Sequence, residues 1–178
     1  MGTLRYILYL ICIFSSGLVF SQKEEIIPWS SERKLAWSDF KGKPFKTAWA
    51  AATTASGISY EFSTAGTAAA PELTINVVTY FYPKKSWYRP ELCDSIILGH
   101  EQLHFDISEL YARKMQKRLS ETRFTKNIKS EIKAIFRQIN RELGQFQNRY
   151  DRETNFSRDL EKQRFWNKMI AEALVNGY

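Results

Sequence analysis

The chain has 178 residues, a formal net charge of +7, and 44% hydrophobic and 15% aromatic residues. This length and composition suit one domain with a single packed core. The basic residues are spread along the sequence, mainly from Arg113 to Lys168. Such a spread is typical of solvated helical faces with weak attraction to anionic surfaces. Nucleic-acid binding is not expected, because no clustered basic module is present.

The N-terminus, residues 1–21, has the pattern of a secretory signal peptide. One basic residue, Arg5, precedes a nearly unbroken apolar run from Tyr6 to Phe20, and modest-sized residues precede a cleavage point before Gln22. A bilayer span needs about 20 residues, so the run is short for one; a retained anchor is the alternative. We expect a secreted or periplasmic protein with one domain, residues 22–178, and no membrane span in the mature chain.

The N-terminal half of that domain reads as a small β-region. Residues Thr47–Phe62 are small and β-tolerant, Ser63–Pro71 has turn composition, and Leu73–Tyr82 is the best strand in the chain because it is β-branched and aromatic. A proline-containing segment that begins at Pro83 stops this strand. The connections are too short for crossovers, so the strands are predicted to pair antiparallel.

The C-terminal half reads as three helices. The first follows Pro90, interpreted as a first-turn proline, and runs to about Leu119. The second spans roughly Thr125–Asn148, with apolar residues at three-to-four spacing. The third is capped by Asn155 or Ser157. The sequence therefore predicts an α+β fold, a small antiparallel β-region followed by about three helices.

A metal-binding motif lies on the first long helix. His100 and His104 are the only histidines of the chain, and Glu101 stands between them in the arrangement H-E-x-x-H. Residues four apart share one face of a helix, so both imidazoles can bind one ion. In this arrangement the histidines are zinc ligands, and the glutamate is the general base beside a metal-bound water.

A catalytic zinc usually takes three protein ligands, and no third histidine exists. The third ligand is then a carboxylate, a thiolate or a second water. Asp106 and Glu109 lie on other faces of the helix than the histidines. Glu109 is predicted to pair with Arg113, four residues on. Asp106 is left with two roles, support of the site from an outer position or the capping of a loop.

The segment between the second and third predicted helices offers further ligands. Asp151 and Glu153 are the candidate carboxylates, and Tyr150 is a candidate hydrogen-bond donor to a developing oxyanion. The alternative for this segment is that Asp151 and Thr154 are turn and cap residues. Cys93, near the start of the first helix, is either a ligand or nucleophile or a small buried hydrophobe.

Several motifs spread over nearly all of the chain after residue 21 carry a family resemblance. They are Leu35-x-Trp37-x-Asp39-Phe40-x-Gly42, Ser86-Trp87, His100-Glu-Gln-Leu-His-Phe-Asp-Ile107, Ala112-Arg113, Tyr150-Asp-Arg-Glu-Thr154 and Gln163-x-x-Trp166. Together they resemble DUF922, a bacterial secreted family of uncharacterised function that is assigned to the zincin-like, zinc-dependent metallopeptidases. The resemblance implies one zincin-like domain that binds Zn²⁺ and acts on a peptide or protein substrate.

The resemblance also implies roles for single residues. It makes His100 and His104 metal ligands and Glu101 the general base. Family members commonly carry Tyr-Asp-x-x-Thr-x-His, and this chain has Phe156 where that histidine falls. If the family uses the histidine on the metal, a ligand is lost; if it uses the aspartate, Asp151 completes the site.

Three functional hypotheses follow. The first is a secreted zinc peptidase, in which the strand Leu73–Tyr82 lines the cleft and pairs with an extended substrate. The second is a catalytically degenerate binding domain of the cell envelope. It is suggested by Phe156 and by the unidentified third ligand. The third is a zinc amidase acting on cell-wall peptides, which shares the site and differs in substrate. The oligomeric state does not follow from the sequence.

Overall fold

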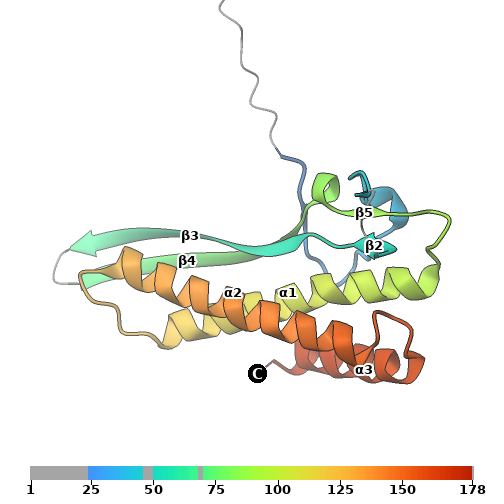
Figure 1. Cartoon of the computed structure of the whole chain (residues 1–178). Helices are drawn as coiled ribbons and strands as arrows, with labels where there is room; N and C mark the ends of the chain where they lie inside the picture. Colours follow the sequence, from blue (N-terminus) through green and yellow to red (C-terminus); the bar gives the residue numbers. More distant parts are fainter. Residues whose placement is uncertain (1–23, 46–49, 68–69, 178) are drawn as a thin grey trace, which may run out of the picture.

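The computed structural model describes residues 24–45, 50–67 and 70–177, and the predicted signal segment lies outside them (Figure 1). The fold is α+β, as predicted: two small antiparallel sheets precede three α-helices. None of the described helices is both long and apolar enough to cross a bilayer.

A long hairpin dominates the sheet region. Strand β3 (Ser56–Thr67) pairs antiparallel with β4 (Ala70–Phe81) in continuous register, and β1 (Ile27–Pro28) adds to the other edge of β4. The predicted antiparallel pairing is confirmed, but the turn predicted over Ser63–Pro71 is too long, because only residues 68–69 lie between the two strands. Pairs such as Thr64 with Leu73 continue the ladder through that segment, because cross-strand pairing outweighs its turn-like composition.

A second, two-stranded sheet lies at the base of the hairpin. Its strands are β2 (Ala52–Thr53) and β5 (Trp87–Tyr88), which follow the short 3₁₀ helices η1 (Trp37–Asp39) and η2 (Pro83–Lys85) respectively. The segment 47–62, described above as β-tolerant, therefore contributes strands to two sheets, and β2 contacts α1.

Two of the three helices, α1 and α3, begin after aspartates that sequence reasoning did not select. Helix α1 (Ser95–Glu121) starts after Asp94, whose Oδ1 accepts hydrogen bonds from the backbone N–H groups of Ile96 and Ile97 at 2.9 Å each. Pro90 instead lies in the preceding turn. An aspartate at this position satisfies N–H groups that the helix leaves unpaired, which explains the later start.

The other two helices also differ from their predicted bounds. Helix α2 (Ile128–Glu153) continues five residues past the predicted end at Asn148, and α3 (Leu160–Asn176) is capped by Asp159. Asn155 and Ser157, predicted as caps, adopt left-handed backbone conformations with φ of 47° and 72° in the connecting turn. Thr154 is the C-cap residue of α2, in agreement with the cap role considered for it.

Helix α1 lies at the centre of the molecule. It contacts β3 and β4 on one side and α2 and α3 on the other (Figure 1). The main core consists of apolar side chains from β3, α1, α2 and α3. Among them are Ile58, Ile107, Met115, Ile132, Ile139, Trp166 and Ile170. The helix that carries the histidine motif is therefore held by packing on every side.

Asp106 connects the N-terminal segment to α1. Its Oδ1 accepts hydrogen bonds from Trp29 Nε1 at 2.8 Å and from Gln102 Nε2 at 2.9 Å, and Lys34 Nζ lies 3.5 Å from Oδ2. Gln102 in turn accepts a bond from the backbone N–H of Leu35. The question left open by the sequence is thereby answered, because Asp106 neither faces the histidines nor caps a loop.

Replacing Asp106 with alanine is expected to lower the free energy of unfolding by about 2 kcal/mol, because it leaves the indole N–H of Trp29 and the amide of Gln102 without their acceptor. Urea unfolding of the purified chain measures the change. Glu172→Ala is the control: it removes an exposed helical ion pair with Lys168 and should have no measurable effect. Equal stability of the two variants would contradict the anchoring role of Asp106.

Candidate metal centre

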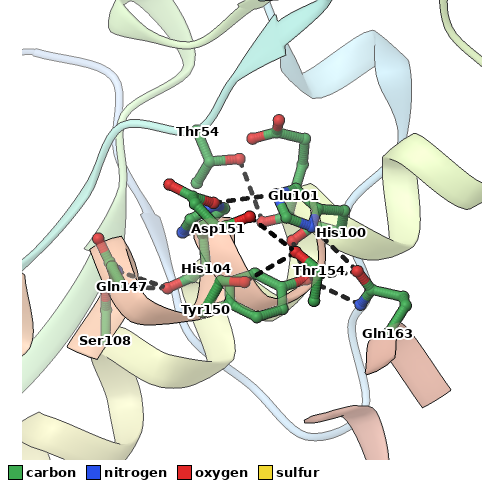
Figure 2. Close-up of polar contacts among 10 residues, drawn as sticks. All are labelled: Thr54, His100, Glu101, His104, Ser108, Gln147, Tyr150, Asp151, Thr154 and Gln163. Carbon is green, nitrogen blue, oxygen red and sulfur yellow. Dashed lines mark hydrogen bonds and ion pairs between the residues drawn. The ribbon is translucent and has the colours of Figure 1, made fainter. Parts of the chain in front are cut away.

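The structure brings three predicted ligands together. His100 and His104 lie on α1, and Asp151 comes from the last turn of α2 (Figure 2). The same carboxylate oxygen, Asp151 Oδ1, is 3.2 Å from His100 Nε2 and 2.9 Å from His104 Nε2. These residues form a group whose possible ligand atoms all lie within 4.8 Å of one another.

The spacing of these atoms suits a tetrahedral metal. For zinc bonds of about 2.0–2.1 Å to nitrogen and oxygen, two ligand atoms of a tetrahedron are about 3.3 Å apart. Both distances from Asp151 Oδ1 are close to that value. A small expansion of the group would place an ion between the three side chains without moving a helix.

Electrostatics favours a cation at this point. Burial alone would raise the pKa of Asp151, but hydrogen bonds from His100 and His104 outweigh it and hold that pKa well below its usual range. Burial alone would lower the pKa of His104, yet Asp151 and Glu101 raise it overall. The carboxylate is therefore ionised. Its negative charge is balanced either by protonated imidazoles or by a metal ion bound to all three side chains.

Asp151 occupies this place because α2 is longer than predicted. The sequence suggested that a turn between helices would aim this carboxylate, and the alternative made it a turn residue. Both readings are wrong, since residue 151 is helical. The last helical turn crosses α1 at the histidine motif and directs Asp151 at both rings, whereas the following turn contains Thr154 and Phe156.

Glu101 lies beside the group with one oxygen left unpaired. Its side chain is buried, and Oε2 has no hydrogen-bond partner among the described residues. A buried carboxylate oxygen without a donor is costly unless a water, a substrate or a metal completes it. Glu101 lines the same pocket as the three ligands, where such a partner has room to bind.

The pocket has a volume of about 540 Å³ and is open to solvent on one side. It is lined by Ala50–Thr54, Leu92, Ile97, His100, Glu101, His104, Gln147, Asp151 and Phe156–Arg158. The prediction that the strand Leu73–Tyr82 lines the cleft is wrong. That strand is β4, none of whose residues lines the pocket, and β2 takes its place there. Thr54 holds this rim by donating to the backbone carbonyl of Glu101 at 3.1 Å.

Gln163 of α3 is a site residue that the sequence reasoning did not identify. Its Oε1 lies 3.0 Å from His100 Nδ1, so it can accept the N–H of that ring and leave Nε2 free for a metal. Its side chain is buried and also bonds the Tyr150 hydroxyl and Asn167. A glutamine shows no distinctive sequence spacing, and only the packing of α3 on α1 reveals its position.

Tyr150 lies behind the site and not at its open side. Its ring stacks on His100 with centroids 4.5 Å apart, and its hydroxyl bonds Gln163 and the backbone carbonyl of His100. The residue is fully buried, and burial raises the pKa of its hydroxyl far above the usual range. This placement does not match the oxyanion role expected for Tyr150; it makes Tyr150 a positioning residue for His100.

The other candidates lie away from the ligand group. Glu153 Oε2 accepts a hydrogen bond from Trp166 Nε1 at 2.9 Å, and Cys93 Sγ donates to the carbonyl of Ala51. Burial raises the pKa of the Cys93 thiol. Phe156 lines the pocket and is 37% exposed, so the position where a family histidine was expected borders the site.

The predicted pairing of Glu109 with Arg113 is confirmed, with Arg113 Nε donating to Glu109 Oε1 at 2.8 Å. This pair lies four residues apart on α1, as expected for a helical ion pair. It confirms that Glu109 is engaged elsewhere than at the histidines.

Metal analysis tests the ligand set. The wild-type chain is expected to bind one zinc ion, and His104→Ala and Asp151→Ala are each expected to weaken binding by more than about 100-fold, because losing a ligand exceeds the effect of losing an outer partner. Zinc titration and elemental analysis measure this. Glu153→Ala is the matched control from the same helical turn and should bind like wild type. Full affinity in Asp151→Ala would remove that residue from the site.

Gln163→Ala is expected to weaken zinc binding about tenfold, because His100 loses the acceptor that fixes its ring. Gln163→Glu keeps an acceptor oxygen and should restore the affinity, which a purely structural role would not explain. Asn167→Ala, which removes the outer partner of the same amide, is the control. Equal zinc affinity in Gln163→Ala and the wild type would contradict the positioning role.

One family model matches most of the chain. The family described as a bacterial protein of unknown function (DUF922) matches residues 30–159, which include β2 to β5, α1, α2 and the following turn, but not β1 or α3. No curated protein and no solved structure matches the chain. Because the match covers well over half of the sequence, the chain belongs to the bacterial DUF922 family, whose function is unknown.

Proposed function

We propose that this chain is a zinc-dependent peptidase. In this proposal His100, His104 and Asp151 hold Zn²⁺, and Glu101 is the general base. The observation that carries it is the convergence of two imidazole nitrogens on one ionised carboxylate, beside a buried glutamate oxygen that has no partner among the described residues. Two nitrogens and one oxygen form a donor set that suits catalytic zinc.

The protein's own groups have distinct roles in the reaction. Bound zinc would act as a Lewis acid that polarises a carbonyl and acidifies water. Glu101 takes the proton of the attacking water while the water oxygen forms a bond to the peptide carbon. The same carboxyl group then delivers that proton to the leaving nitrogen as the C–N bond breaks. Gln163 and Tyr150 keep the His100 ring in its orientation throughout.

The rim of the pocket supports an extended substrate. Strand β2 lines the pocket, and one of its edges pairs with β5. We propose that its other edge pairs with the substrate backbone by β-addition, the role expected earlier for Leu73–Tyr82. Leu92 and Phe156 contribute apolar surface near the ligands.

Phe156 bears on the choice between a peptidase and a degenerate binding domain. A degenerate site would be favoured if residue 156 had to supply the third ligand. Asp151 already contacts both histidines, so the group has three donors without residue 156. This supports a working enzyme over the binding domain. Cell-wall amidase action uses the same residues and remains a question of substrate, and we propose a secreted or periplasmic location from the N-terminal segment.

Glu101→Gln tests the mechanism directly. The variant is expected to bind zinc like wild type, and its kcat/KM for peptides should fall by about 100-fold or more, because a general base typically contributes that much. A broad peptide mixture, followed by mass spectrometry with and without chelator, measures hydrolysis. Glu109→Gln, on the same helix but paired with Arg113, is the control. Full activity in Glu101→Gln would exclude this mechanism.

A further inference from the structure

Between Lys129 and Arg141 the exposed residues of α2 include basic side chains and no acidic one; the exposed Glu153 lies further along the helix, paired with Arg149. Four exposed residues of α2, each four positions from the next, define what we term the basic stripe: Lys129, Lys133, Arg137 and Arg141. None of the four makes an ion pair within the described parts of the chain. A solvated helix normally interleaves both signs of charge, so an unpaired row of one sign is informative.

The glutamates of α2 do not neutralise this row. Glu131 is half-buried and accepts hydrogen bonds from Thr125 at the start of the helix. Glu142, also half-buried, is bonded by Arg118 of α1. The hydrogen bond from Arg118 is the main cause that lowers the pKa of Glu142, so this carboxylate is already engaged with another cation. The positive potential of the stripe is therefore directed outward to solvent.

The stripe leads toward the candidate metal centre. Lys133 precedes Asp151 on the same helix by 18 residues, or five turns at 3.6 residues per turn, so both project from the same side of α2. At 1.5 Å per residue the two positions are about 27 Å apart along the axis. Figure 1 shows α2 running along the molecule from the hairpin end toward the end where α3 begins. An extended polypeptide would span that length with about eight residues.

The spacing of the charges fits an extended acidic chain. Cations four residues apart on a helix are separated by about 6 Å along the axis. Side chains on one face of an extended peptide, two residues apart, are separated by about 6.6 Å. A row of acidic residues at alternate positions would therefore stay close to consecutive cations of the stripe. A lipid surface would instead meet a plane of charges, whereas this is a single line along α2, whose last member, Arg141, precedes Asp151 by 10 residues, or about 15 Å along the axis.

We propose that the basic stripe is an extended subsite that binds an acidic segment of a polypeptide substrate, about five to ten residues from the bond cleaved at the metal centre. This inference rests on the proposed peptidase function and adds a substrate class to it. The four cations of the basic stripe take no part in the reaction proposed at His100, His104 and Asp151, and the subsite would give them a function.

Binding of poly-L-glutamate to the full chain tests the surface without requiring catalysis. The double variant K133E/R137E is expected to weaken binding at least tenfold at low salt, and added salt should reduce wild-type binding. R164E/K168E on α3 is the matched control, with the same charge change at the same four-residue spacing on exposed positions, and it should stay within about twofold of wild type. Equal loss in both double variants would overturn the proposal as a net-charge effect. Stripe-dependent binding to phosphatidylglycerol vesicles without binding to polyglutamate would overturn it in favour of a membrane surface.

Hydrolysis supplies the second arm. Two peptides share one cleaved sequence, and one of them carries glutamate at alternate positions about five to ten residues away. K133E/R137E should raise KM for the acidic peptide about tenfold, with kcat and the neutral peptide unchanged. Equal KM values for the acidic peptide in the wild type and the variant would overturn the subsite. If neither peptide nor any other is hydrolysed while polyglutamate binding still depends on the stripe, the peptidase function fails and the acidic-ligand surface stands.

Discussion

The fold depends on the burial of a helix that is not apolar. Helix α1 is enclosed by the hairpin, α2 and α3, yet His100, Glu101, Asp106 and Ser108 are among its buried residues. Buried polar groups require partners, and each of the surrounding elements supplies one. Trp29 reaches Asp106, Ser56 reaches Ser108, and Gln163 reaches His100. These contacts specify how the other elements are arranged around α1 as well as building the site.

The same constraint explains the metal centre. The two histidines of α1 cannot remain buried side by side without an acceptor, and Asp151 provides it from α2. The contact fixes where the end of α2 crosses α1, and Gln147, one turn earlier, adds a bond to the carbonyl of His104. Metal binding and helix packing therefore use one set of residues. The family match covers these elements together, from the N-terminal segment to the turn after α2.

Sequence reasoning identified the local features of this molecule and missed the long-range ones. The motif at His100 and His104 depends on helical spacing, and the pair of Glu109 with Arg113 depends on the same rule, so both were predictable. Asp151 was selected as one of two carboxylates, but for the wrong reason, since the length of α2 decides its direction. Gln163 was noted only as part of the motif Gln163-x-x-Trp166, and its contact with His100 could not be predicted, because that contact depends on the docking of α3. Tyr150 was placed near the site, but the side of His100 that it covers is set by packing.

The hairpin illustrates a further limit. Residues 63–67 have the composition of a turn, and the strand continues through them because each residue finds a cross-strand partner in β4. Local propensity is a weak guide where pairing supplies the backbone hydrogen bonds. Conversely, β4 was recognised correctly as a strand but assigned to the pocket, since nothing in its sequence shows that β2, and not β4, lies at the pocket.

The turn between α2 and α3 has a consequence for engineering the protein. Asn155, Phe156 and Ser157 are consecutive non-glycine residues with φ of 47°, 52° and 72°, conformations that each carry an energetic cost. The turn joins Asp151 to Gln163, so its shape sets the separation of two residues that contact the same imidazole. Glycine at these positions would remove the conformational strain of the backbone, but it would also widen the range of conformations that the turn samples. At these three positions, a substitution that raises thermostability is therefore expected to position the metal ligands less precisely.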